Sequence, residues 1–209
     1  MKLYQFPLSP NSQKVVALAH EVGLPLETVY VDLFKGQSKS PEMLARNPNG
    51  RVPVLEDGDF VLWESNAMLG YIAGKADRTD LAPTAPRDRA DVDRWLSWSS
   101  SHFGPAIRKV AVERIVKKLA GLGAPDEALV KAGTEEFGVF TAVLDRCLEG
   151  KDYLCGRLTI ADFAIAPYAA LCESAGLDVT PYRNVRRWLG RMLAKESMQR
   201  TLQAAREAP

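Results

Sequence analysis

The sequence predicts two domains, a small α/β domain followed by an all-helical one. Strand and helix signals alternate over residues 2–76, whereas only helical periodicity continues after residue 86. A polar stretch with two prolines, residues 77–86, lies between these two patterns. The 209 residues are enough for two small domains that each bury a core. We therefore expect domains at residues 1–76 and 87–209, joined by a linker at 77–86.

The first domain alternates short strands with helices. The expected elements are a strand at 2–6, a helix at 12–22, a strand at 27–33, a short helix ending near 46, strands at 52–56 and 60–63, and a helix at 64–75. Ser40 and Pro41 are typical of a helix start, and Asp57-Gly58 is typical of a hairpin turn. The order β-α-β-α-β-β-α predicts one α/β layer.

The second domain contains only helical patterns. They cover residues 88–120, 125–148, 159–175, 185–194 and 197–206. Gly104-Pro105 is expected to kink or break the first of them, because proline cannot donate the helical hydrogen bond. Thr159 and Asp162 have the spacing of a structural capping box.

Composition excludes several classes of function. Lys plus Arg is 27 and Asp plus Glu is 26, so the net charge of +1 provides no general attraction for nucleic acid. No stretch reaches the roughly 18 apolar residues of a membrane helix. The first 14 residues hold no apolar run like that of a signal peptide, which predicts a cytoplasmic protein. The three cysteines form no C-x-x-C motif and the two histidines lie far apart, so we expect no metal site.

Residues 9–12 join the first strand to the first helix and carry two hydroxyl groups. A helix N-terminus attracts anions, and the hydroxyl of Ser9 or Ser12 could donate a hydrogen bond to a ligand thiolate. For Asn11 and Ser12 an ordinary helix-capping role is favoured. For Ser9 the residues alone leave both interpretations open.

Two further segments suggest binding but also have ordinary explanations. Pro53 could be a cis proline that exposes the backbone of Val52, but cis bonds occupy only about 5% of X–Pro positions. A proline that simply begins a strand is therefore favoured. Glu64 and Ser65 could receive the ammonium and carboxylate of an amino-acid head group. An ordinary helix start is favoured there as well.

Taken in order, these segments resemble the glutathione transferase superfamily. The motifs are LSPNS at 8–12, KSPE at 39–42, NP at 47–48, VPVL at 52–55, ES at 64–65 and YLCGRLTIAD at 153–162. The similarity spans residues 2 to about 190 and is greatest to phi- and theta-type members and their bacterial relatives. It implies a thioredoxin-like N-terminal domain and an all-α helical-bundle domain that lines a site for a hydrophobic electrophile.

The resemblance also implies roles for individual residues. Ser9 matches the serine that hydrogen-bonds the glutathione sulfur, with Ser12 and Asn11 as alternatives. Val52 precedes the position of the family's cis proline, Pro53, and matches the residue whose backbone pairs with the cysteinyl part of glutathione. The remaining glutathione contacts match Glu64 and Ser65 at the γ-glutamyl end and Lys39 and Arg51 at the glycyl carboxylate. His102 and Phe103 are the candidates for the electrophile pocket.

The expected function is conjugation of the glutathione thiolate to a hydrophobic electrophile, a detoxification reaction, by a homodimer. No cofactor other than the co-substrate glutathione is expected. The alternatives are a non-catalytic glutathione-binding protein of the same fold, or a peroxidase or isomerase that uses the same thiolate. A disulfide reductase is disfavoured because the first loop holds no cysteine.

Overall fold

The computed structural model describes residues 1–208 and divides them into two compact units. The first unit comprises Met1–Ala82 together with the described residues from Lys195 onward, and the second is Pro83–Ala194. The last helix therefore groups with the first unit, whereas the sequence placed it in the helical domain at 87–209. Periodicity identifies a helix but does not say which neighbour it packs against.

The first unit has the predicted order of elements, a thioredoxin-like β-α-β-α-β-β-α arrangement. Its elements are β1 (Lys2–Gln5), α1 (Pro10–Val22), β2 (Glu27–Tyr30), a 3-10 turn (Gln37–Lys39), α2 (Pro41–Arg46), β3 (Val54–Asp57), β4 (Phe60–Leu62) and α3 (Ser65–Lys75). The sheet order is β2-β1-β3-β4, with β1 and β2 parallel and the other pairs antiparallel.

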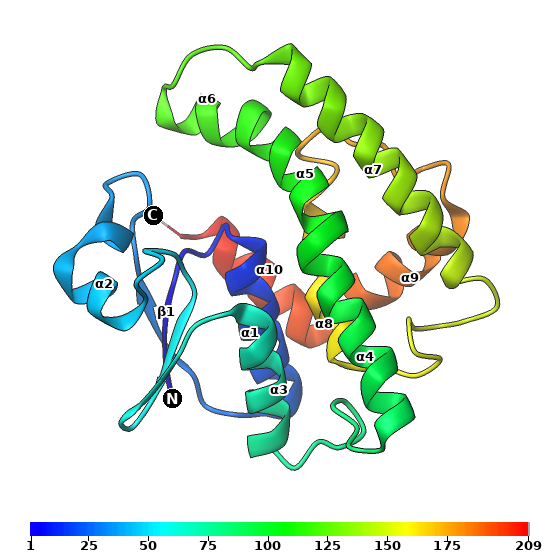
Figure 1. Ribbon diagram of the computed structural model, residues 1–209, viewed down its shortest axis with the longest axis horizontal. Helices are drawn as coiled ribbons and strands as arrows, with labels where there is room; N and C mark the ends of the chain where they lie inside the picture. The colour runs from blue at the N-terminus through cyan, green and yellow to red at the C-terminus, as the bar shows by residue number, and fades with distance from the viewer. Residues whose placement is uncertain (209) are drawn as a thin grey trace. The chain divides into compact units, whose positions relative to one another are not determined.

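Both faces of this sheet are covered. Leu3 pairs with Leu55 across β1 and β3, and both side chains are buried. On the opposite face Val54 is buried with Met43 of α2, and Tyr4 packs against them. Alternate residues of a strand point to opposite faces, so α2 covers one face while α1 and α3 cover the other (Figure 1). The start of α1, the start of β3 and the start of α3 all belong to this unit.

The C-terminal helix α10 (Glu196–Arg206) lies beside α1 (Figure 1). Glu21 of α1 accepts a hydrogen bond of 2.6 Å from the Ser197 hydroxyl and forms an ion pair of 2.9 Å with Lys195. The His20 ring nitrogen Nδ1 lies 3.2 Å from the Thr201 hydroxyl oxygen. These contacts, together with buried Met198, explain why this helix belongs to the first unit.

The second unit is helical over its described length. Its elements are α4 (Pro86–Trp98), a π-helical turn (Ser99–Phe103), α5 (Gly104–Ala111), a second π-helical turn (Val112–Val116), α6 (Lys117–Ala120), α7 (Glu127–Cys147), α8 (Ile160–Leu171) and α9 (Arg183–Leu193). No helix within residues 1–208 is long and apolar enough to cross a membrane.

The sequence predicts a kink or a break at Gly104-Pro105; the chain does not break there, but the α-helix is interrupted by a π-helical turn just before Pro105. The chain passes from α4 through the π-helical turn into α5 without leaving helical geometry, as the green segment of Figure 1 shows. Pro105 lies in the first turn of α5, and the widened turn before it adapts the hydrogen-bond register to the missing N–H group.

The predicted capping box is present at the start of α8. The Thr159 backbone N–H donates to the Asp162 carboxylate at 2.9 Å, and the Thr159 hydroxyl caps the helix in return. Asp162 is fully buried and also accepts hydrogen bonds from the Leu154 N–H at 3.0 Å and the Trp188 indole N–H at 2.9 Å. Burial raises the pKa of Asp162, while these donors favour its ionised form.

Candidate functional site

Ser9 is the N-cap of α1, and its side chain makes no capping hydrogen bond. Its backbone N–H donates to the Phe6 carbonyl at 2.9 Å, and its carbonyl accepts from the backbone of Ser12 and Gln13. Pro10 follows at the first helical position, where a missing N–H costs nothing. The backbone thus holds Ser9 in place while its hydroxyl remains available to a ligand at the positive end of the helix.

The two alternatives to Ser9 are already engaged. The Ser12 side chain is completely buried, and its hydroxyl oxygen accepts from the Phe6 N–H at 3.4 Å. The Asn11 side-chain oxygen accepts from the Ser65 hydroxyl at 3.2 Å. The expectation that Ser12 or Asn11 caps α1 is wrong, because Pro10 begins the helix earlier and makes Ser9 the N-cap.

The Val52–Pro53 peptide bond is cis, so the favoured interpretation of an ordinary strand-initiating proline is wrong. The residues alone favoured a trans bond because cis prolines are a small minority, whereas the family resemblance implied the cis bond that is observed. Pro53 is buried immediately before β3, and half-buried Val52 packs on the cluster formed by Val31, Met43 and Val54.

Glu64 is the N-cap of α3 and has a positive φ of 72°. Its side chain is exposed and makes no capping bond, whereas buried Ser65 occupies the first helical position. Positive φ is unusual for a residue with a side chain and is concentrated at binding sites. The turn leaves an exposed carboxylate beside the first N–H groups of α3, one acidic and one anion-binding element together.

Lys14 is a polar residue of this region that the sequence interpretation missed. It is 2% exposed, and its ammonium donates to the Asn66 side-chain oxygen at 2.6 Å. Burial lowers the pKa of Lys14 to about 7, although the negative charge of Glu64 acts in the opposite direction and raises this pKa. The available signal was its spacing, since position 14 lies on the same helix face as the buried Ala17 and Leu18.

Lys39 and Arg51 lie on exposed segments on either side of α2. The Lys39 ammonium donates to the Asn49 carbonyl at 3.2 Å, and its aliphatic chain lies against Gly50. Gly50 has a φ of 57°, and a Cβ atom there would approach Lys39 Cδ and Nζ to 2.6 Å. The carbonyl of Arg51 accepts from the Asn47 side chain at 2.8 Å, which fixes the loop but leaves the guanidinium exposed.

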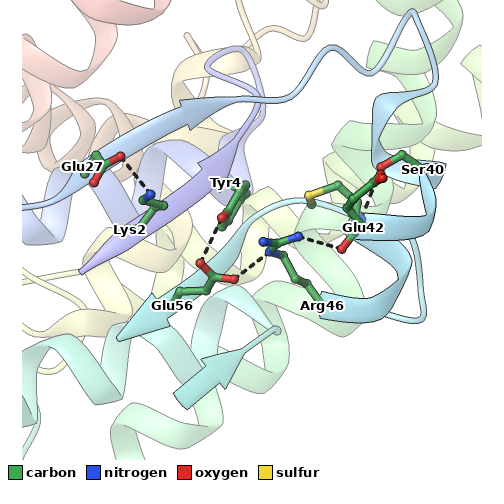
Figure 2. Close-up of polar contacts among 8 residues, drawn as sticks. Lys2, Tyr4, Glu27, Ser40, Glu42, Arg46 and Glu56 are labelled. Carbon is green, nitrogen blue, oxygen red and sulfur yellow. Dashed lines mark hydrogen bonds and ion pairs between the residues drawn. The ribbon is translucent and has the colours of Figure 1, made fainter. Parts of the chain in front are cut away.

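A polar network attaches α2 to the sheet (Figure 2). Glu56 accepts from the Tyr4 hydroxyl at 3.0 Å and from Arg46 at 2.6 Å, and the guanidinium lies 4.6 Å from the Tyr4 ring centre. Burial raises the pKa of Glu56, but the hydrogen bonds from Arg46 and Tyr4 outweigh it and the net pKa is lowered. Tyr4 is therefore engaged in holding α2 against the sheet.

The two electrophile-pocket candidates lie in the helical unit. The Phe103 side chain is completely buried and stacks on Trp98, with ring centres 5.4 Å apart. His102 is exposed, and its ring lies 5.1 Å from that of Phe140. Phe103 thus belongs to an aromatic core and has no accessible surface here, while the pocket role of His102 stays a prediction.

Residues 1–208 contain no group of three or more His, Cys, Asp or Glu side chains placed to hold a metal ion. The polar groups collected in the first unit are instead a hydroxyl at a helix N-terminus, a carboxylate beside a second helix N-terminus, and two cations near a loop. Such a set suits a small peptide with an ammonium, two carboxylates and a thiol. The fold therefore defines a class, the proteins with a thioredoxin-like domain followed by a helical domain.

Comparison with known proteins gives the family. Residues 1–74 match the family model "Glutathione S-transferase, N-terminal domain", and residues 127–191 match the corresponding C-terminal domain. The chain is 38% identical to Glutathione S-transferase 3 of Zea mays, covering 98% of this chain and 94% of that protein. It is 30% identical to Glutathione S-transferase GstB of Escherichia coli, covering 93% of each. The chain belongs to the glutathione transferase family.

Solved structures agree with this assignment. Glutathione transferase F7 of Populus trichocarpa superposes with a TM-score of 0.89 at 31% identity, covering 98% of each chain. Glutathione transferase URE2P8 of Phanerochaete chrysosporium, solved with oxidized glutathione, has a TM-score of 0.88 at 29% identity, covering 99% of this chain and 95% of that one.

Proposed function

We propose that this protein is a glutathione transferase that lowers the thiol pKa of bound glutathione through Ser9 and directs the thiolate at an apolar electrophile. The observation that carries the proposal is the Ser9 hydroxyl. It sits at the N-terminus of α1, is held by backbone hydrogen bonds and makes no bond to its own helix. Ser12 is buried and engaged, and the Asn11 side-chain oxygen accepts from Ser65.

The rest of the peptide would bind around Ser9. The Glu64 carboxylate takes the ammonium of the γ-glutamyl group, and the backbone N–H of Ser65 with the other first N–H groups of α3 takes the adjacent carboxylate. The backbone of Val52, before cis Pro53, pairs with the cysteinyl unit. Lys39 and Arg51 neutralise the glycyl carboxylate.

Thiolate stabilisation needs a defined amount of free energy. Lowering a thiol pKa from about 8.5 by about 2 pH units corresponds to about 2.7 kcal/mol. A charge-assisted hydrogen bond contributes about 1.5–3 kcal/mol and a helix N-terminus about 0.3–1 kcal/mol. Ser9 and α1 together can therefore supply this amount without any covalent intermediate.

In the conjugation step the thiolate lone pair forms the new carbon–sulfur bond. The electron pair of the broken bond leaves with the departing group, or passes to the adjacent atom when the electrophile is an unsaturated acceptor. The thiol proton has already been released to solvent. The protein contributes proximity and a lowered thiol pKa.

The cytoplasmic location, the homodimer and the role of His102 in the electrophile pocket follow from the family resemblance and stay part of this proposal. Analytical ultracentrifugation of the purified chain measures the oligomeric state. A sedimenting species of twice the 23.0 kDa chain mass is the expected result, and a monomer at micromolar concentration contradicts the dimer.

The direct test is steady-state conjugation of glutathione to aryl halides and isothiocyanates. We expect turnover by the wild type and a loss of about 100-fold in kcat/KM for Ser9→Ala, the usual effect of removing one donor to a reacting anion. Ser174→Ala, which removes an exposed hydroxyl in the other unit, should retain wild-type rates. Binding of glutathione without turnover would support the non-catalytic alternative. Turnover only with hydroperoxides would support a peroxidase.

A further inference from the structure

A buried lysine lies between the two helices that form the glutathione site. Lys14 is on α1, one and a half turns after Ser9, and only 2% of its surface is exposed. A buried ammonium is costly unless a partner stabilises it, and lysine is among the residues that are almost never fully buried. Its placement therefore requires a physical explanation.

The ammonium of Lys14 is directed at the start of α3. It donates to the Asn66 side-chain oxygen at 2.6 Å, and one turn earlier Asn11 accepts from the Ser65 hydroxyl at 3.2 Å. Two residues of one α1 face thus hold two consecutive residues of the first turn of α3. The orientation of the N–H groups of this turn depends on these bonds.

One exposed carboxylate acts on the buried Lys14 ammonium. Glu64 is the carboxylate whose field acts on it, and that side chain is exposed to solvent. Helix α10 also packs on α1. The cations of this region lie near the C-terminal end of α1, where Lys195 forms an ion pair with Glu21 and the charge of Arg200 lowers the pKa of His20. On the sheet, Lys2 pairs with Glu27. A second anion at the start of α3 would therefore stabilise the charged form of Lys14.

We propose that Lys14 is a positioning residue of the glutathione site: through Asn66 it fixes the first turn of α3, and its buried charge stabilises the α-carboxylate of the γ-glutamyl group bound there. This inference rests on the proposed glutathione binding. It has a second consequence, because an arriving carboxylate raises the pKa of Lys14. Ligand binding near neutral pH then takes up protons.

The first experiment uses two ligands that differ only in the α-carboxylate, namely glutathione and 4-aminobutyryl-cysteinyl-glycine. Calorimetric titrations compare the wild type, Lys14→Met, Lys14→Arg and the exposed control Lys131→Met. We expect Lys14→Met to raise the Kd of glutathione about tenfold and the Kd of the analogue less than twofold. The tenfold factor corresponds to an interaction of one pKa unit between Lys14 and the α-carboxylate. Lys14→Arg should recover most of the affinity, and Lys131→Met should match the wild type.

The second experiment needs only the wild type and remains decisive if Lys14→Met does not fold. S-methylglutathione has no thiol proton to release, so its titration at pH 7 in buffers of different ionisation enthalpy reports protons exchanged by the protein. About half of the Lys14 side chains are protonated at a pH equal to their pKa, so we expect uptake of up to about 0.5 proton per ligand.

Equal losses of affinity for both ligands, or no proton uptake by the wild type, would overturn the role of Lys14 while leaving the proposed function intact. Failure of the wild type to bind glutathione at all would instead overturn the proposed function, and this inference with it.

Discussion

Ser9, Asn11 and Ser12 lie within one turn of sequence but have different surroundings. Only the Ser9 hydroxyl lacks a partner within residues 1–208, whereas Ser12 accepts from the Phe6 N–H just after β1 and Asn11 accepts from Ser65. From the residue types alone, Ser9 could be either part of an ordinary turn or the residue that contacts the ligand thiol. The difference arises from Pro10, which begins the helix early enough to direct Ser12 into the core.

Ser12→Ala tests this division of roles. Removing the hydroxyl leaves the buried Phe6 N–H without its partner, so we expect the free energy of unfolding to fall by about 1–2 kcal/mol. Urea denaturation measures the loss. The thiol pKa of bound glutathione should not change, and a change there would mean that Ser12 contacts the sulfur.

Lys14 gives a pH dependence with a definite sign. Its pKa is about 7 in the folded protein and 10.5 in its unperturbed form, so between these values the unfolded chain binds a proton that the folded chain lacks. The stability of unliganded wild type relative to Lys14→Met should therefore rise with pH over this interval, by at most about 1.4 kcal/mol per pH unit.

Denaturation of both proteins at pH 7, 8.5 and 10 measures this difference. The Lys14→Met variant should be the more stable at pH 7, and its advantage should shrink toward pH 10. An advantage that is the same at all three values would show that Lys14 is not neutralised on folding. The exposed lysine in Lys131→Met is the control and should give no pH-dependent difference.

At the scale of elements, the sequence predicted the strands and helices of the first unit because their periodicities are short and strongly marked by turn residues. The residues alone did not predict the cis bond before Pro53, which the family resemblance implied. The sequence did not predict that the helix would continue through Gly104-Pro105, where a π-helical turn comes before Pro105 and the proline occupies the first turn of α5. The positive φ at Glu64 had no sequence signal, because glutamate gives no indication of that conformation.

The loop after α2 provides a test of the glycyl end of the site. Gly50→Ala places a Cβ atom 2.6 Å from Lys39 Cδ and Nζ, so the lysine must move. We expect the Kd of glutathione to rise about two- to fivefold, the range for one exposed ionic contact. The Kd of γ-glutamylcysteine, which lacks the glycyl carboxylate, should stay constant.

Gly58→Ala is a matched control for this substitution. Gly58 has a similar φ of 64°, but a Cβ atom there meets nothing within 4 Å. Both variants should lose similar stability from the left-handed conformation, about 1–2 kcal/mol. An equal loss of glutathione affinity in both would contradict a specific role for Lys39.

The start of α8 provides a stability test within the helical unit. Asp162→Ala removes the acceptor of four buried donors, namely the backbone N–H and hydroxyl of Thr159, the Leu154 N–H and the Trp188 indole N–H. Each unsatisfied donor costs about 1–3 kcal/mol, so we expect at least about 3 kcal/mol of destabilisation in urea. Asp178→Ala, which removes an exposed loop carboxylate that accepts from the Thr180 N–H, should cost less than about 1 kcal/mol. A small effect of Asp162→Ala would show that these donors find water instead.

For the whole molecule, the division into an α/β part and a helical part was predictable because the two parts have different periodicities. The return of α10 to the first unit was not, because it depends on contacts of Glu21 with Lys195 and Ser197 far along the chain. The near-zero net charge likewise conceals local charges, because Lys39 and Arg51 are exposed cations on either side of α2 and Glu64 is an exposed carboxylate at the start of α3. That arrangement suits a small peptide with charges at both ends.

The central claim is that Ser9 stabilises the thiolate of bound glutathione. Thiolate absorbance of the complex, followed against pH for the wild type, Ser9→Ala and Ser12→Ala, measures it most directly. We expect a thiol pKa about 2 pH units below the free value of about 8.5 in the wild type and in Ser12→Ala, and a return close to the free value in Ser9→Ala. A Ser9→Ala complex whose thiol pKa stays as low as that of the wild type would contradict the account.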